Sequence, residues 1–351
     1  MLKQLKIFSL LFLFGAFSAS LASCDFVYED EGDCRSTYRV HFVYDMNLKW
    51  ADAFPSEVHS VNLYIFDEKG VFVKEFAQSG EQLDQPGFCI EFNDETILPG
   101  KYTLLAWCQN DNTKAGTSFT VPTPVAGVTT LEEMTCTLNT LSNEQYPEYS
   151  DTQLAFLYHG MEEVELPAIH EGLTYDYTVS LTKDTNHIRI MLQERSSDID
   201  ESDYKMMIVS NNGRLGYNNQ PLPGFPDVTY LTWALTPDQI GIIGDDALTY
   251  RYGLIGDFST SRLMASESED LFLTIIKTDT EETIATVPVT EYALLARKYY
   301  EEAYNKKMSD QEFLDRKDEY EMTFILQDGR WVETQIEILS WRLVLKNYDL
   351  N

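Results

Sequence analysis

Short runs of alternating apolar and polar residues, separated by turn signals, recur along most of this 351-residue chain. In the first run, Tyr38, Val40 and Phe42 fall on one side, and Arg39 and His41 fall on the other. A period of two residues is typical of a strand that buries one face and exposes the other. Because such runs dominate the chain, the sequence predicts a mainly β protein.

Two hairpins and several single strands are predicted from this pattern. Residues 61–76 form two apolar runs around 67–70, a polar turn that ends in glycine. Residues 320–336 repeat the pattern around Asp328-Gly329, a dipeptide that favours a tight hairpin turn. The other predicted strands are Phe88–Phe92, Thr103–Trp107, Leu173–Leu181, His187–Leu192, Tyr204–Ser210, Tyr230–Leu235, Leu271–Lys277 and Ile336–Leu345.

The length of the chain and one polar segment predict two domains. A domain typically holds about 100–150 residues, and Asn139–Thr152 is polar and carries a proline, as a linker often does. We therefore expect an N-terminal β-sandwich domain over residues 37–152 and a C-terminal β-sandwich domain over residues 153–351. Residues 291–319 show helical spacing and the capping sequence Ser309-Asp-Gln-Glu312, which predicts an αα insertion. We expect this insertion to cap an open end of a sandwich, with a partner surface as the alternative.

The first 24 residues are typical of a secretory signal. A basic start precedes the apolar run 7–19, and Leu21-Ala-Ser23-Cys24 follows. The apolar run is too short for a comfortable bilayer span, which takes about 20 residues. Leu-Ala-Ser-Cys resembles the lipobox of bacterial lipoproteins, in which the cysteine receives a diacylglyceryl group. The resemblance implies cleavage between Ser23 and Cys24, which removes residues 1–23. The alternative is an ordinary signal peptide with an incidental cysteine.

Residues 24–36 form an acidic segment between that cysteine and the first predicted strand. The segment has few apolar residues, so one interpretation is a disordered, solvated tether. It is also similar to the acidic tract that directs Bacteroidetes lipoproteins to the outer face of the outer membrane.

The formal net charge of −31 excludes partners that require a basic surface. Such a chain repels phosphate backbones, so nucleic acid is not expected as a partner. Anionic membrane surfaces repel it as well, which leaves a lipid on Cys24 as the means of attachment. Stable attachment takes more than one acyl chain, because each buried methylene contributes only about 0.8 kcal/mol.

Four cysteines remain if Cys24 carries a lipid: Cys34, Cys89, Cys108 and Cys136. In an oxidising compartment they are possible disulfide partners, and zero, one or two bonds with unknown pairing stay open. No Cys-x-x-Cys occurs, and the five histidines have no ligand spacing, so no metal site is expected.

The sequence lacks the motifs that would indicate an enzyme or a cofactor. There is no Gly-x-Ser-x-Gly, no His-Glu-x-x-His and no glycine-rich phosphate loop. With 57 acidic residues, carboxylate pairs are expected by chance and indicate no site. We therefore expect a protein without catalytic residues and without a cofactor.

Several stretches together resemble the FimB/Mfa2 family of Bacteroidales fimbrial anchor and tip-associated lipoproteins. These stretches are Val40–Phe54 with Tyr44-Asp-Met-Asn47, Val61–Asp67, Leu157–Gly160, Val179–Arg189, Met308–Arg316 with Asp318–Tyr320, and the final Trp341-Arg-Leu-Val block. The resemblance implies two tandem transthyretin-like β-sandwich domains. It also implies a lipoprotein of the outer membrane, exposed at the cell surface, that holds the shaft subunits of its own fimbrial system and limits the length of the fimbrium.

The short N-terminal segment favours an anchor over a shaft subunit. Shaft subunits of such fimbriae resemble proteins that lose an N-terminal strand to proteolysis and receive a strand from a neighbour. Here only Asp25–Ser36 separates Cys24 from the first predicted strand, so removal of that strand would also sever the anchor. We expect the mature protein to keep both.

Two hypotheses from other classes remain open. The 21 tyrosines would suit a surface lipoprotein whose β-sandwich binds glycans by ring stacking, although such residues are more often core or strand-surface pairs. A lipid-anchored hydrolase is a weaker alternative, because it would rest on carboxylates alone. Finally, the C-terminal strand material Ile336–Leu345 is a candidate element for partner contact.

Overall fold

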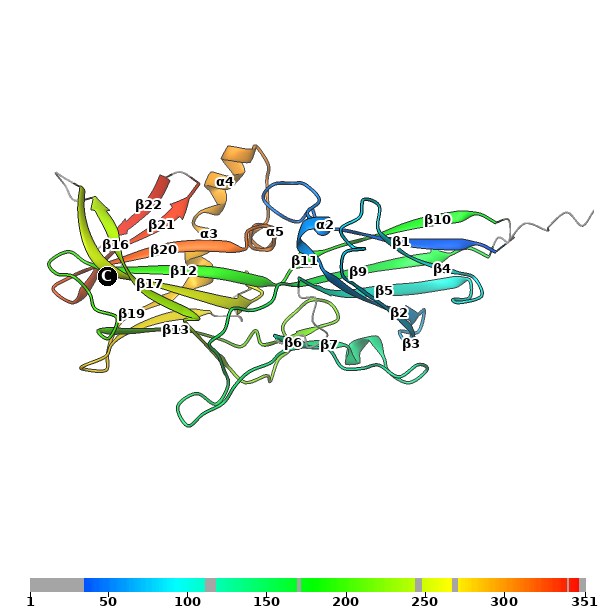
Figure 1. Ribbon diagram of the computed structural model, residues 1–351, viewed down its shortest axis with the longest axis horizontal. Coiled ribbons are helices and arrows are strands. Elements are labelled where there is room, and N and C mark those ends of the chain that lie inside the picture. The colour runs from blue at the N-terminus through cyan, green and yellow to red at the C-terminus, as the bar shows by residue number, and fades with distance from the viewer. Residues whose placement is uncertain are drawn as a thin grey trace, which may run out of the picture.

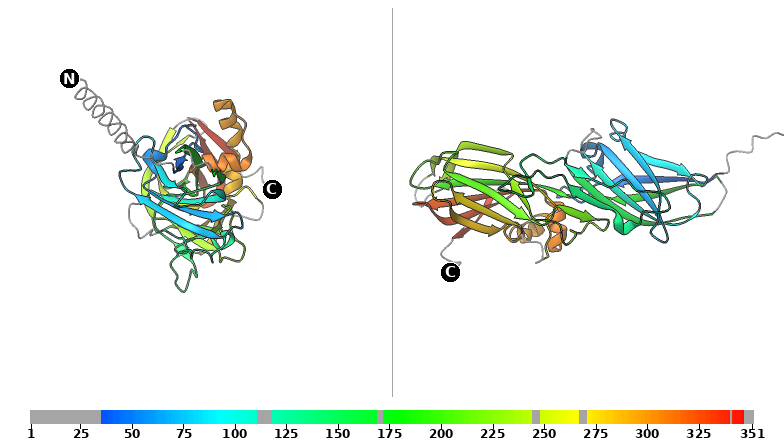
Figure 2. Two further views of the ribbon diagram at one scale, coloured as in Figure 1. Left: turned by 90° about the vertical axis from the view of Figure 1, so that its right-hand side faces the viewer. Right: turned by 90° about the horizontal axis from the view of Figure 1, so that it is seen from below.

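The computed structural model describes residues 35–110, 118–168, 172–243, 248–266, 271–339 and 341–346. Strands make up 52% of the described residues and helices 10%, which confirms the prediction of a mainly β protein. The molecule is elongated, and two lobes of facing sheets follow one another along its long axis (Figure 1, Figure 2).

The N-terminal lobe consists of two facing sheets with strand orders β10-β1-β4 and β11-β9-β5-β2-β3. Its elements are β1 (Thr37–Val43), α2 (Phe54–Glu57), β2 (Ser60–Asp67), β3 (Phe72–Ser79), β4 (Cys89–Asn93), β5 (Gly100–Gln109), β9 (Leu157–Leu166), β10 (Thr174–Ser180) and β11 (Thr182–Lys183). As the alternation predicts, Tyr38, Val40 and Phe42 of β1 are buried in the core between the sheets.

The C-terminal lobe also has two facing sheets, with strand orders β16-β17-β12-β20-β21-β22 and β19-β18-β13-β15-β8. Its strands are β8 (Tyr149–Ser150), β12 (Thr185–Glu194), β13 (Tyr204–Ser210), β15 (Val228–Leu231), β16 (Ala234–Ile243), β17 (Leu248–Ser261), β18 (Phe272–Lys277), β19 (Glu282–Pro288), β20 (Glu319–Gln327), β21 (Arg330–Ile338) and β22 (Trp341–Lys346). The core of this lobe is continuous with residues on the far side of the larger N-terminal sheet. A small sheet, β14-β7-β6, contributes to that region through β6 (Phe119–Thr120), β7 (Thr135–Leu138), β14 (Arg214–Gly216) and the short helix η1 (Leu131–Glu133).

Both predicted hairpins are present. β2 pairs with β3 across the turn 67–70, in which Gly70 has a φ of 73°. β20 pairs with β21 across Asp328 and Gly329, both of which have positive φ, as a type I′ turn requires.

Two predicted strands are each divided by the structure. Ile336–Leu345 falls on β21 and β22, because Leu339 adopts a φ of 56° and turns the chain. Tyr230–Leu235 falls on β15 and β16, which belong to different sheets.

The strand pairing corrects the predicted assignment of β9 and β10. The sequence placed both strands in the unit 153–351, but β9 pairs with β5 and β10 pairs with β1 in the N-terminal sheets. Pairing partners far apart in sequence leave no local signal, so the polar segment before Thr152 was a misleading boundary.

The predicted insertion at 291–319 is helical but contains three helices instead of two. They are α3 (Val289–Leu294), α4 (Arg297–Tyr304) and α5 (Asp310–Arg316). Ser309 caps α5 as expected, since its side chain accepts a hydrogen bond from the Glu312 N–H. Asn305, with a φ of 52°, ends α4.

Candidate functional site at the junction between the lobes

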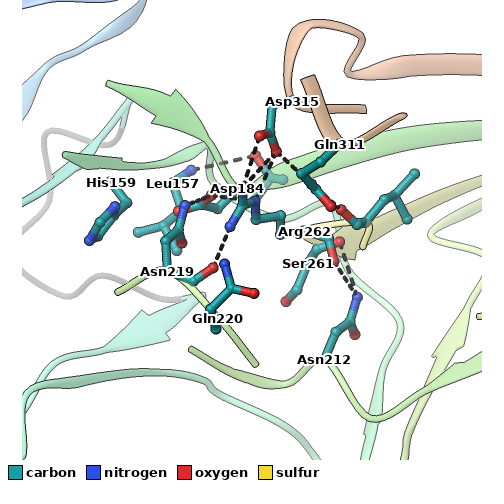
Figure 3. Close-up of polar contacts among 12 residues, drawn as sticks. Leu157, His159, Asp184, Asn212, Asn219, Gln220, Ser261, Arg262, Gln311 and Asp315 are labelled. Atoms are coloured by element: carbon teal, nitrogen blue, oxygen red, sulfur yellow. Dashed lines mark hydrogen bonds and ion pairs between the residues drawn. The ribbon is translucent and has the colours of Figure 1, made fainter. Parts of the chain in front are cut away.

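The two lobes meet where the chain leaves β10 and enters β12 through Leu181–Asp184. Asp184 is completely buried there, and its N–H donates to the Leu157 carbonyl oxygen at 2.7 Å. Its carboxylate accepts a hydrogen bond of 2.8 Å from Asn219 and lies 3.7 Å from Nε of Arg262 (Figure 3). A buried carboxylate is tolerated only when such partners replace the lost water.

Arg262 connects three segments at this point. Its Nε and Nη2 each donate to a different oxygen of Asp315 on α5, both at 2.9 Å. Its Nη1 donates to the backbone oxygen of Asn219. Gln311 holds Asp315 in turn, with 2.9 Å between Nε2 and Oδ1 (Figure 3). The guanidinium thus binds helix α5 and the loop at 219 to the buried Asp184.

A second set of charged side chains, centred on Lys183, lies at the same junction. The ammonium of Lys183 pairs with Asp318 and lies 3.6 Å from a carboxylate oxygen of Glu57. It also lies 3.5 Å from the ring centre of Phe156. Tyr158 donates its hydroxyl to Glu57 at 3.0 Å. Because Glu57 and Lys183 come from the N-terminal lobe and Asp318 from the C-terminal lobe, these contacts cross the junction.

The helical insertion contacts a loop of the N-terminal lobe. Arg316 of α5 donates to the backbone oxygens of Asp45 and Asn47 at 3.0 and 3.4 Å. Its guanidinium lies 3.5 Å from the ring centre of Trp50, and the Lys306 ammonium lies 3.7 Å from the same ring. Each such cation–π contact contributes about 0.5–2 kcal/mol. Arg316 and Lys306 of the insertion thus contact the N-terminal lobe across the junction.

Four of the stretches that carried the family resemblance meet at this junction: Tyr44–Asn47, Leu157–Gly160, Thr182–Asn186 and Met308–Arg316. Sequence reasoning interpreted 182–186 only as a polar bend. It missed Arg262 and Asn219, because neither stands in a motif and their partners are distant in sequence.

Burial shifts two titratable groups here in opposite senses. Loss of solvation raises the pKa of Asp184 from 3.8 to about 7, although Arg262 opposes the shift. Burial lowers the pKa of His159 from 6.5 to about 4, so its imidazole is neutral and Nε2 donates to the Tyr217 oxygen at 2.8 Å.

These shifts predict opposing effects of pH on stability. The raised pKa of Asp184 contributes to folding stability at low pH, and this contribution is lost as pH rises from about 4 to 7. The lowered pKa of His159 contributes to folding stability at higher pH, and this contribution is lost as pH falls from about 6.5 to 4. The free energy of unfolding should therefore rise with pH across this window more steeply in Asp184→Asn than in the wild type. In His159→Gln the free energy of unfolding should rise less steeply with pH than in the wild type. The difference in slope should be up to about 1.4 kcal/mol per pH unit. Urea titrations from pH 4 to 7 measure both slopes, and slopes parallel to the wild type in both variants would contradict the assignment.

Strand β1 connects the N-terminus to this junction. It is the middle strand of its sheet, parallel to β10 in register Thr37↔Thr174 and antiparallel to β4. The predicted lipidation and cleavage residues, Cys24 and Ser23, and also Cys34, lie outside the described residues.

The described cysteines are free thiols. Cys89 is partly buried on β4, and Cys108 and Cys136 are buried in different core clusters. Burial raises the pKa of all three thiols, which keeps them protonated and unreactive.

Within the described part of the chain, no group of three or more His, Cys, Asp or Glu side chains is arranged to hold a metal ion. In the same residues, no helix has both the length and the apolar character that a membrane span needs.

Comparison with known proteins places the chain among fimbrial proteins. The family model of fimbrillin-A associated anchor proteins Mfa1 and Mfa2 matches residues 30–347. A comparison with curated proteins gives no match.

Solved structures share the fold over most of their length. A candidate adhesin from Bacteroides thetaiotaomicron is 26% identical, with a TM-score of 0.73 over 87% of this chain and 96% of that chain. A candidate polysaccharide-binding protein from the same organism is 23% identical, with a TM-score of 0.71 over 90% and 99%. The fimbrial anchor protein Mfa2 from Porphyromonas gingivalis is 16% identical, with a TM-score of 0.61 over 88% and 99%.

Proposed function

We propose, from the premise that the chain belongs to the family of fimbrillin-A associated anchor proteins Mfa1 and Mfa2, that it holds a fimbrium to the outer membrane and limits its length. Membership confirms the resemblance seen in the sequence and makes the chain a fimbria-associated protein. The family is one of structural anchor proteins, in agreement with the absence of enzymatic motifs from the sequence.

The proposed attachment is a lipid on Cys24, formed after cleavage between Ser23 and Cys24. The motif Leu21-Ala-Ser-Cys24 and the acidic segment that follows it support this assignment. Two or three acyl chains would make the attachment stable, because one chain binds only marginally. The proposed location is the outer face of the outer membrane, and the proposed partners are the shaft subunits of the same fimbrial system.

The observation that carries the proposal is the position of β1. This strand lies between β10 and β4, with its apolar side chains in the core, and follows Cys24 after only a short segment. A partner strand could take the place between β10 and β4 only if β1 left it, and β1 cannot be cut away without losing the lipid. A subunit whose own strand fills the sheet permanently would end a polymer that grows by strand addition.

We also propose that the lobes are two tandem transthyretin-like β-sandwich domains. The facing sheets of each lobe and the similarity to the Mfa2 fold support this division. The domain boundary would then lie near Leu181–Asp184 instead of at 152, because β9 and β10 complete the N-terminal sheets.

Deletion of the gene tests the proposed function. Cells without this protein should release fimbriae into the medium, and the released fimbriae should be longer than those of the wild type, as electron microscopy would measure. Fimbriae that stay on the cells at normal length would refute the anchor function. Saturable glycan binding by the purified protein, together with unchanged fimbriae, would favour the glycan-binding alternative instead.

A further inference from the structure

Strand β1 runs along the long axis of the molecule, from the outer end of the N-terminal lobe towards the junction (Figure 1). Arg35, the first described residue, therefore marks the place where tension from the membrane would enter the fold. The C-terminal lobe lies at the opposite end of that axis (Figure 2).

The neighbouring strand β10 connects to the C-terminal lobe, which would be held in place while β1 is pulled. It runs parallel to β1, and its C-terminal end continues through Leu181–Asp184 directly into β12. Strand β12 is paired on both sides, with β17 and β20, in the large sheet of the C-terminal lobe. A pull on Arg35 with the C-terminal lobe held fixed would therefore slide β1 lengthwise past β10.

We propose that β1 and β10 form a shear clamp, a pair of parallel strands that carries tension between the membrane anchor and the C-terminal lobe. The inference rests on the proposed anchoring function, because only an attached protein bears this load. It adds a mechanical role to β1, beyond that of filling its sheet.

The pairing explains why the clamp would resist force. β1 faces β10 at seven paired positions, Thr37↔Thr174 through Val43↔Ser180, and faces β4 at five more. A force parallel to the strands loads the hydrogen bonds along the ladder together, so they must fail together. A force perpendicular to the strands loads the bonds at one end and opens them in succession.

Side chains of β1 oppose sliding as well. Tyr38 and Val40 are completely buried, and the Tyr38 hydroxyl donates to the Pro167 oxygen at 2.9 Å. On the outer face, Arg39 pairs with Glu91 of β4 at 2.9 Å. Sliding by one residue would move each buried side chain to the solvent face, because side chains alternate along a strand.

A second path reaches the same lobe from the far end of β1. The strand continues into residues 44–53, where Arg316 binds the Asp45 and Asn47 oxygens and stacks on Trp50. The inner end of β1 is thus held by the helical insertion while its outer end is pulled. Both paths lead from β1 to the C-terminal lobe, so the Arg316 contacts and the β1–β10 ladder share the load in parallel.

Single-molecule force spectroscopy on the full mature chain tests the clamp by changing only the direction of pull. In the first geometry, handles at residue 24 and at the exposed Ser197, just after β12, load β1 in shear. In the matched control, handles at residue 24 and exposed Glu95 peel β1 from β4, because Glu95 follows the β4 end that faces Thr37. At equal pulling speed, the first rupture force should be about twofold or more higher in shear than in peeling, since forced unfolding follows the barrier along the pulled coordinate.

Equal rupture forces in the two geometries would overturn the clamp, as would a first rupture that frees the C-terminal lobe while β1 stays paired. Urea unfolding of both handled proteins should give the same free energy, which shows that direction, not stability, sets the difference. The anchoring function is tested separately, by the fimbriae of the deletion strain, so failure of either proposal can be recognised by itself.

Discussion

Replacement of Cys24 by alanine is expected to release fimbriae from the cell surface while leaving the folded protein intact. The thiol is the only group at this position that can receive the lipid, and alanine removes it without touching the described fold. The loss should be nearly complete, because the strongly acidic chain gains nothing from contact with an anionic membrane. Immunoblots of fimbrial subunits in cell and medium fractions, with urea unfolding of the purified variant, measure both effects.

Cys34→Ala is the matched control for this experiment. It removes another cysteine ten positions away but leaves Leu21-Ala-Ser-Cys24 unchanged. Fimbriae should stay attached in this control, and mass analysis of its membrane form should find the acylated N-terminus at Cys24. Normal retention of fimbriae in Cys24→Ala would show that another contact holds the fimbrium and would refute lipid anchoring.

Sequence reasoning succeeded where the signal is local. The alternation at Tyr38, Val40 and Phe42 predicts which face of β1 is buried, because that face repeats every second residue. Likewise, Asp328 and Gly329 predict a hairpin, because the turn conformation is set by the two residues themselves.

The same reasoning failed where the pairing partner is distant in sequence or where a strand contains proline or glycine. The long hairpin of β16 and β17 was largely missed because Pro237 and several glycines dilute its strand pattern. The structure accounts for these residues: Pro237 stands on an edge strand, where a missing donor is tolerated. At Gly253, a Cβ atom would clash with the backbone oxygen of Leu192, so a larger residue would push the paired strands apart.

The contacts at the junction could not be predicted, because only the fold brings their residues together. Asp184 stands in a polar stretch that reads as a solvated bend, yet it is completely buried. Its partners Arg262 and Asn219 come from distant segments of the chain, and neither of them belongs to a motif. The family resemblance marked some of these stretches but gave no physical reason for them, and the buried ion pairs now supply one.

Replacement of Arg262 by methionine should strongly destabilise the described fold. Methionine keeps much of the side-chain volume but leaves Asp184 and Asp315 without their shared cation in a buried site. Breaking a buried pair by removing one partner typically costs about 3–5 kcal/mol. We expect a loss of this size in the free energy of unfolding from urea titration. Arg39→Met is the matched control, because Arg39 and its partner Glu91 have side chains that are 43% and 52% exposed, and an exposed pair contributes little to stability.

A triple variant separates lost charge pairing from lost packing at this position. Arg262→Met combined with Asp184→Asn and Asp315→Asn removes the buried charges together, so most of the lost stability should return. If the triple variant stays as unstable as Arg262→Met, packing and not charge pairing holds the junction. Recovery of stability would instead identify the ion pairs as the contacts that keep the C-terminal lobe fixed to the strand that follows Cys24.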